Sequence, residues 1–299
     1  MGTLLAGLLA RAGEEVTLLD YKPERAAQLA EFGLTVKTPE GDFSVPIRAT
    51  ADASEAGFAD VILVCVKAFQ TVAAAEHALP CVSRATTLLT LQNGLGNLEA
   101  LSEIFGAERV IGGVTAHGAT MAEPGKVIHT GVGETVIGEQ TGKITARLEE
   151  IQLALNNAGI STSVTLNLPS AIWGKLVLNC AINPLAALTR LRNGDLLKEP
   201  ALADLLVNVA KEAASVAKAS GIKLPYNKPA EQVIKLCQLT AGNINSMLAD
   251  VLSRRPTEIN QINGAVARAA AAAGLPAPLN EALTAIVSGI EAEYDRQVR

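Results

Sequence analysis

The stretch Trp173-Gly-Lys-Leu-Val-Leu-Asn-Cys-Ala-Ile-Asn-Pro184 lies just past the middle of this 299-residue chain, and its spacing predicts a helix. Its apolar residues recur as they do on the buried face of a helix. Lys175, Asn179 and Asn183 are spaced i, i+4 and i+8, so a helix places them along one face. Asparagine is a poor helix former that needs a partner for its amide. An ammonium and two carboxamides suit a small oxygen-rich anion; alternatively, Lys175 is solvated and the asparagines cap or cross-link neighbouring elements.

Outward from this stretch, the chain changes character near residue 167. From Ala171 onward nearly all of it has a helical pattern, interrupted by prolines and glycines. Before residue 167, apolar runs of strand length alternate with helical segments, which is typical of a doubly wound parallel sheet. The runs are Glu15–Asp20, Asp60–Lys67, Leu88–Gly94 and Arg109–Val114, followed by two short strands of a predicted antiparallel edge within Lys126–Ile137. We therefore predict an α/β domain over residues 1–167 and an all-helical domain over residues 168–299.

The composition argues against several classes of protein. The chain is 49% hydrophobic but only 3% aromatic, which favours α/β and all-α layers over a β-sandwich. A net charge of −5 disfavours a nucleic-acid-binding surface. No apolar run stands out as a membrane span, and the N-terminus lacks a basic signal region. The four cysteines are scattered without a C-x-x-C pair, so we predict no metal site, no disulfide and a reducing, cytoplasmic location. The alanine-rich helices are compatible with a homodimer.

The N-terminal residues match half of a dinucleotide-binding unit. Gly2 lies near the start of an apolar helix, and the strand that follows ends at Asp20. The full G-x-G-x-x-G turn, which brings a pyrophosphate to a helix N-terminus, is not present. We expect Gly2 to be its last glycine and about ten residues, with a first strand and two glycines, to precede Met1. Asp20 would accept the ribose hydroxyls of NAD, whereas Lys22 and Arg25 would hold the 2′-phosphate of NADP; the alternative for both cations is ordinary surface charge.

Polar residues also follow two later strands. Lys67 ends an apolar run, at the carboxyl edge of a parallel sheet where ligands bind in this architecture; the alternative is a lysine that simply ends the strand. Asn93 either forms only a turn or offers its amide to a nicotinamide. His117 follows another strand and is expected to be structural, and we assign no role to His77 or His129.

In the helical half, Asn243, Asn245 and Ser246 precede an apolar segment, and Glu258 follows twelve residues after Ser246. Thr257 could cap a helix that begins after Pro256, which would place Glu258 in its first turn, where a carboxylate is favoured. That placement would explain the presence of a glutamate at position 258 by helix stability alone, without a functional role. Neither a Ser-His-Asp set nor a carboxylate cluster suited to a metal is evident.

Four blocks of sequence, taken together, resemble the ketopantoate reductase (2-dehydropantoate 2-reductase) family over essentially the whole chain. The blocks are Val66–Gln70, Leu91–Gly94, Trp173–Pro184, and Ser246–Leu248 with Thr257–Ile259 and Ile262–Gly264. The resemblance implies an N-terminal Rossmann-like domain, a helical C-terminal domain, and NADPH-dependent reduction of 2-dehydropantoate to pantoate in pantothenate biosynthesis. The alternatives are a related reductase of another small 2-keto acid and a dinucleotide-binding protein without catalysis.

The resemblance also implies roles for individual residues. Lys175 corresponds to the catalytic lysine and Glu258 to its acidic partner. The implied substrate-binding residues are Asn179, Asn183, Asn193, Asn243 and Ser246, and the implied cofactor contacts are Lys67, Gln70 and Asn93. NADP is the expected cofactor, with NAD as the alternative because Asp20 stands near a position where NADP-preferring members often carry a basic residue. The substrate is expected to lie between the two domains.

Overall fold

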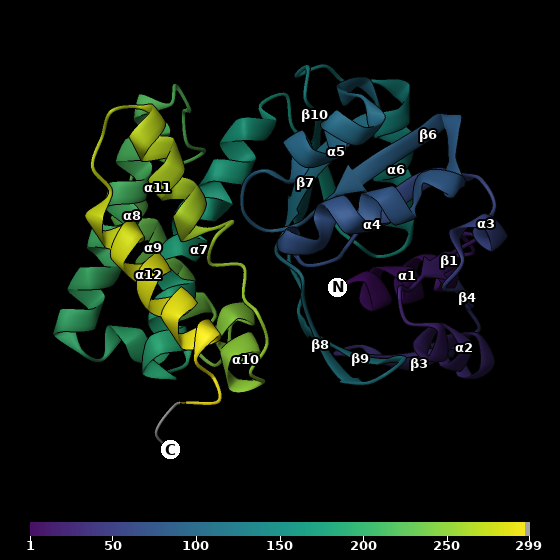
Figure 1. Cartoon of the computed structure of the whole chain (residues 1–299), viewed down its shortest axis with the longest axis horizontal. Coiled ribbons are helices and arrows are strands. Elements are labelled where there is room, and N and C mark those ends of the chain that lie inside the picture. The colour runs from purple at the N-terminus through teal and green to yellow at the C-terminus, as the bar shows by residue number, and fades with distance from the viewer. Residues whose placement is uncertain (297–299) are drawn as a thin grey trace. The chain divides into compact units, whose positions relative to one another are not determined.

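The computed structural model describes residues 1–296, which form two compact units (Figure 1). The first unit comprises Met1–Gln92 and Asn97–Leu168, and the second comprises Asn93–Gly96 and Pro169–Arg299. The short loop Asn93–Gly96 therefore belongs with the helical unit, although the sequence places it inside the α/β unit.

The first unit is built on a five-stranded sheet with the order β11-β10-β7-β6-β5. Its strands are β5 (Ala59–Val64), β6 (Val82–Thr90), β7 (Val110–Thr115), β10 (Thr135–Glu139) and β11 (Thr162–Val164). Strands β5, β6 and β7 are parallel, whereas β10 is antiparallel to β7 and parallel to β11. The apolar run Val61–Val64 of β5 and the fully buried Leu88 and Leu89 of β6 suit strands that are covered on both faces.

Helices cover both faces of this sheet, which confirms the doubly wound prediction. Leu89 and Ile111 share a cluster with side chains of α1 and α6, whereas Leu88 and Val110 pack with α4 and α5. Neighbouring residues of a strand point to opposite faces, so the two helix pairs lie on opposite sides. The helices of this unit are α1 (Gly2–Arg11), α2 (Pro23–Phe32), α3 (Ala53–Ala56), α4 (Thr71–His77), α5 (Asn97–Phe105) and α6 (Ala146–Asn157), with 3-10 turns η1 (Ala68–Gln70), η2 (Leu79–Cys81) and η3 (Ala107–Arg109).

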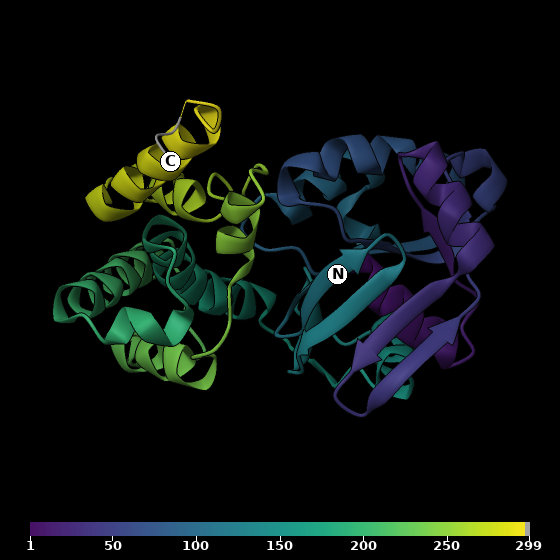
Figure 2. The same ribbon diagram turned by 90° about the horizontal axis from the view of Figure 1, so that it is seen from below.

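Two smaller sheets complete the unit. Strands β1 (Thr17–Leu19) and β4 (Arg48–Thr50) form a parallel pair. The other sheet has the order β3-β2-β9-β8 and appears as purple and teal hairpins in Figure 2. Its strands are β2 (Leu34–Thr38), β3 (Gly41–Val45), β8 (Gly118–Glu123) and β9 (Lys126–Gly131). The sequence pattern did not predict β2, β3 or β8.

The prediction of one antiparallel edge within Lys126–Ile137 is wrong. Strand β9 pairs with β2 and β8, whereas β10 lies between β7 and β11 in the larger sheet. Both segments are strands, but they do not pair with each other: β9 is antiparallel to β8, the strand just before it in the chain, and parallel to β2. Val127 of β9 packs with α1 and Val36 of β2, and Ile137 of β10 packs in the same core from the other sheet. Both strands therefore bury a side chain in one core while belonging to different sheets.

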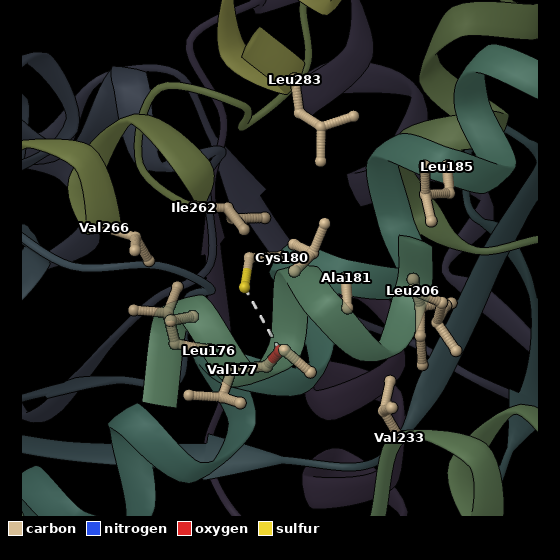
Figure 3. Close-up of a cluster of buried hydrophobic side chains, with 14 of the residues drawn as sticks. Leu176, Val177, Cys180, Ala181, Leu185, Leu206, Val233, Ile262, Val266 and Leu283 are labelled. Atoms are coloured by element: carbon tan, nitrogen blue, oxygen red, sulfur yellow. Dashed lines mark hydrogen bonds between the residues drawn. The ribbon is translucent and has the colours of Figure 1, made fainter. Parts of the chain in front are cut away.

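The second unit is helical and is built around α7 (Leu168–Thr189). The other elements are η4 (Asn193–Leu197), α8 (Pro200–Ala219), α9 (Pro229–Leu239), α10 (Ser246–Leu252), α11 (Asn263–Ala272) and α12 (Pro278–Ala292). Leu176, Val177 and Ala181 of α7 are buried against side chains from the surrounding helices, among them Val233 and Val266 (Figure 3).

Helix α7 is long and apolar enough to cross a membrane by length and composition. However, 67% of its most apolar window is buried inside the protein. The central position of α7 in the helical core explains its apolar character without a membrane, because every neighbouring helix needs an apolar surface to pack on.

Candidate functional site

Lys175, Asn179 and Asn183 lie on α7, as the spacing predicts. Lys175 and Asn179 are half-buried, and Asn183 is only 5% exposed. The residue before the lysine is a glycine because the α8–α9 connection packs against it. A Cβ on Gly174 would lie 2.7 Å from Cγ of Pro225, and the hydroxyl of Tyr226 donates a 2.7 Å hydrogen bond to the Gly174 carbonyl oxygen. This close contact fixes the backbone from which Lys175 projects.

The surroundings of Lys175 make its ammonium group more acidic than usual. Burial lowers the pKa of Lys175 from 10.5 to about 8, and the Glu258 carboxylate partly opposes this shift. Removal of water disfavours the charged form of an amine, whereas a nearby anion favours it. Lys175 is therefore protonated at neutral pH. Its pKa of about 8 is also close to neutrality, which is the property that suits a group for donating a proton.

Glu258 lies in a turn before α11 and is only 6% exposed. The structure overturns the explanation that places Glu258 in the first turn of a helix capped by Thr257, because α11 begins only at Asn263. Instead, Thr257 bonds to the carboxylate of Glu291 and accepts a hydrogen bond from the backbone N–H of Ile259 at 3.1 Å. Glu258 therefore lies in a buried turn outside any helix. An attraction between its carboxylate and a helix N-terminus does not explain why a glutamate stands at this position.

The loop Asn93–Gly96 docks on this turn. The side-chain Nδ2 of Asn93 donates to Oε2 of Glu258 at 3.2 Å, and the backbone N–H of Leu95 donates to the carbonyl oxygen of Gln261 at 2.9 Å. Gly94 has a φ of +84°, and a Cβ there would collide with that same carbonyl oxygen. The dipeptide Asn93-Gly94 is therefore more than a turn, because only glycine allows the approach that brings Asn93 to the carboxylate.

A second polar group surrounds the start of α10. Asn193 donates from Nδ2 to Oγ1 of Thr240 at 3.0 Å and accepts from Nδ2 of Asn245 at 3.1 Å, and its backbone N–H donates to the Asn243 carbonyl oxygen at 3.1 Å. Asn245 also caps α10 by accepting from the N–H of Leu248 at 3.0 Å. The side chain of Asn193 thus holds together the loops that present Asn243 and Ser246, both of which are exposed.

Asn245 stands between Asn243 and Ser246 in the sequence, but no role was predicted for it. The signal for it was available, since asparagine immediately before an apolar helical segment is a typical N-cap. Its second contact, to Asn193, joins residues 52 apart in sequence and had no local signal.

The α/β unit holds the other predicted cofactor residues. A Cβ on Gly2 would lie 3.1 Å from Cβ of Cys65, so the start of α1 closely approaches the end of β5. Lys67 directly precedes η1, and the N–H of Gln70 donates to the Lys67 carbonyl oxygen at 2.7 Å. Close packing of helix and strand beside the carboxyl ends of parallel strands is the setting in which dinucleotides bind.

Asp20 follows β1 and is engaged with its neighbours. Its carboxylate accepts from the backbone N–H of Lys22 at 2.9 Å and from both Nε and Nη2 of Arg25, the latter at 2.7 Å. This hydrogen bonding raises the pKa of Arg25 above its ordinary value. The two cations also lie over the ring of Tyr21, 5.6 Å and 5.4 Å from its centre. Asp20, Lys22 and Arg25 therefore form one cluster beside the exposed ring of Tyr21.

The structure thus gathers Lys175, Glu258 and Asn93 in the helical unit, while Gly2, Asp20, Lys22, Arg25, Lys67 and Gln70 lie in the α/β unit. Within residues 1–296, no group of three or more His, Cys, Asp or Glu side chains is arranged to hold a metal ion.

Comparison with known proteins gives consistent matches along the chain. Residues 1–142 match the family model described as "Ketopantoate reductase PanE/ApbA", and residues 167–291 match its C-terminal counterpart. The chain is 37% identical to a 2-dehydropantoate 2-reductase of Pyrococcus horikoshii, over 97% of this chain and 94% of that protein. It is 35% identical to the protein of the same name from Halobacterium salinarum, over 96% and 94% of the two chains. The crystal structure of a 2-dehydropantoate 2-reductase from Geobacter metallireducens superposes with a TM-score of 0.91 at 32% identity, covering 96% of each chain.

Proposed function

This chain belongs to the ketopantoate reductase family of oxidoreductases, and from that premise we propose that it reduces 2-dehydropantoate to pantoate with NADPH. The observation that carries the proposal is the pairing of Lys175, whose pKa is lowered to about 8, with the buried carboxylate of Glu258. The reaction would serve pantothenate biosynthesis. We also propose a reducing, cytoplasmic setting, because all four cysteines are free thiols.

Lys175 is the proposed general acid. Reduction of a 2-keto group builds negative charge on the carbonyl oxygen, which then takes up a proton to become the hydroxyl. A positioned ammonium group stabilises that charge and donates the proton. The neutral amine that remains recovers its proton from solvent, and the neighbouring Glu258 carboxylate favours the recharged form.

Glu258 is the proposed orienting group for the lysine and an acceptor for a substrate hydroxyl. Its Oε2 already accepts from Asn93, which holds the carboxylate in one orientation. A carboxylate has further lone pairs available to the Lys175 ammonium and to a hydroxyl of the substrate. This assigns Asn93 to the substrate side of the chemistry as well as to its expected contact with the nicotinamide.

The α/β unit is the proposed binding unit for the dinucleotide, through Gly2, Lys67 and Gln70 near the phosphates and nicotinamide and through the Asp20 cluster at the adenosine end. When bound, NADPH supplies the hydride. The residues of this unit bind and orient it.

We expect Ser246→Ala and Asn183→Ala each to raise the KM for the keto acid by about 10–100-fold. Each variant removes a hydrogen bond to the substrate carboxylate, and a bond to a charged group contributes roughly 1.5–3 kcal/mol. Steady-state kinetics at saturating NADPH would measure this. Ser215→Ala, at an exposed serine of α8, is the matched control. A weaker affinity for NADPH with an unchanged keto-acid KM would show that these residues serve the cofactor instead.

We expect Asp20→Ala to raise the ratio of kcat/KM for NADPH over that for NADH by about tenfold, and Arg25→Ala to lower it. Asp20 now neutralises Arg25, and its removal leaves the guanidinium to meet a 2′-phosphate. Arg84→Ala, at an exposed arginine of β6, is the control. An unchanged ratio in both variants would place the 2′-phosphate elsewhere.

One pair of measurements tests the proposed function as a whole. Calorimetric titration with NADPH and NADH would give the cofactor preference, and oxidation of NADPH on addition of 2-dehydropantoate would give the activity. Turnover only with another small 2-keto acid would favour a related reductase. Cofactor binding without turnover of any keto acid would favour a dinucleotide-binding protein without catalysis. Light scattering of the same sample would test the predicted homodimer.

A further inference from the structure

Helix α7 contains a proline in its interior, Pro184, and this residue leaves one backbone carbonyl oxygen of the helix without its usual N–H donor. In a regular helix the N–H of residue 184 would donate to the carbonyl oxygen of Cys180. Proline has no N–H, and its ring also pushes against that carbonyl and bends the helix. Cys180 is fully buried, so water does not replace the missing donor, and a buried carbonyl left alone is costly.

Asn263, the first residue of α11, supplies the missing donor. Its Nδ2 donates to the Cys180 carbonyl oxygen at 2.8 Å and also to Oδ1 of Asn280 at 3.0 Å. Asn280 in turn donates from Nδ2 to Oε1 of Glu212 at 2.8 Å. The orientation of both amides is fixed, since a carbonyl and a carboxylate at the two ends can only accept. We call this series of hydrogen-bonded groups the Asn263 relay: the Cys180 carbonyl, Asn263, Asn280 and Glu212.

The Asn263 relay ties four helices together inside the core. Asn263 and Asn280 are both 0% exposed. Glu212 on α8 also accepts from the backbone N–H groups of Leu279 and Asn280 at 3.1 Å and 2.8 Å, which caps the start of α12. The relay therefore holds α7 against α8, α11 and α12 at the turn that contains Pro184. Within residues 1–296, Oδ1 of Asn263 has no hydrogen-bond partner. The amide group is oriented so that Nδ2 donates to both the Cys180 carbonyl oxygen and Oδ1 of Asn280, and its own oxygen stays unsatisfied in return.

We propose that Pro184 and Asn263 are positioning residues that set the course of α7 through the substrate site. Pro184 follows Asn183 directly, so the bend that a proline causes would fall between the part of α7 that carries Lys175 and the part that leads to Asn193. A straight helix would satisfy the Cys180 carbonyl by itself and would need neither the proline nor the buried amide. The inference rests on the proposed function, because it concerns where substrate-binding groups stand relative to the general acid.

The test uses Pro184→Ala, Asn263→Leu and the double variant, each in the full chain. In Pro184→Ala, residue 184 regains an N–H for Cys180, so α7 can straighten while remaining fully hydrogen-bonded. We expect it to fold with an unchanged or higher melting temperature, and to raise the keto-acid KM by about 10–100-fold, as small displacements of binding groups do. NADPH affinity should stay as in the wild type. Pro200→Ala is the matched control, because proline at the first position of α8 replaces no helical bond.

The double variant distinguishes a role of Pro184 and Asn263 in positioning the substrate site from a role in stability alone. Asn263→Leu should lower the melting temperature and raise the KM, because the Cys180 carbonyl loses its donor. Adding Pro184→Ala should recover part of the melting temperature, since the helix then supplies its own donor, but the KM should stay raised. Recovery of both quantities, or a wild-type KM in Pro184→Ala alone, would overturn the proposal.

A crystal structure of Pro184→Ala provides a readout that does not depend on activity. We expect Asn183 to be displaced relative to Lys175. An α7 that keeps its wild-type course in this variant would overturn the positioning role, whichever keto acid the enzyme reduces. Absence of wild-type turnover with 2-dehydropantoate would instead count against the proposed function and would leave the structural comparison decisive for α7.

Discussion

Replacing Lys175 with alanine should lower kcat by about 10²–10⁴-fold while leaving the fold intact, because the variant removes the general acid. The side chain is half-buried, and its shortening removes no part of the apolar core around α7. Steady-state assays would measure the loss, and thermal denaturation would check folding. Lys211→Ala, at an exposed lysine of α8, should leave turnover unchanged. Wild-type turnover in Lys175→Ala would rule out the assigned role.

The same assignment fixes the direction of the pH dependence. The pKa of Lys175 is lowered to about 8, so the ammonium form is present below that pH and is lost above it. Since the acid must be protonated to act, the rate of reduction should fall as pH rises through about 8. Lys175→Ala should lack this descending limb in whatever activity remains.

Replacing Glu258 with glutamine should produce the second largest loss, about 10²-fold or more in kcat/KM, and should move the descending limb to lower pH. The carboxylate is the group that raises the pKa of Lys175 against the effect of burial, so its neutralisation leaves a still more acidic lysine. Glutamine keeps an oxygen for Asn93, and the variant therefore isolates the charge.

A pH–rate profile of Glu258→Gln beside the wild type would check this prediction. Glu281→Gln, at an exposed glutamate of α12, is the control for loss of one negative charge. If the limb stays at the wild-type pH, Glu258 does not set the charge state of Lys175, and its role is confined to binding.

The sequence by itself determined the features that depend on neighbouring residues. The helical period aligned Lys175, Asn179 and Asn183, and α7 carries all three on one helix. Alternating strand and helix patterns predicted the doubly wound sheet, because each element must bury an apolar face whose period is local. The resemblance in four short blocks identified the family that the comparisons then showed.

Only the tertiary structure decided which distant groups meet. Asn93 reaches Glu258 across 165 residues of chain, and no local pattern of Asn93-Gly94 distinguishes that contact from a simple turn. Strand β9 pairs with β2, far away in the sequence, as well as with its neighbour β8, whereas the nearby β10 joins the other sheet. The buried amide of Asn263 is likewise explained only by the carbonyl that Pro184 leaves open. The periodicity of a segment indicates which of its faces is buried, but packing of the whole chain decides which other element covers that face. Partners far apart in sequence are possible because the entropy cost of closing the intervening loop grows only slowly with its length.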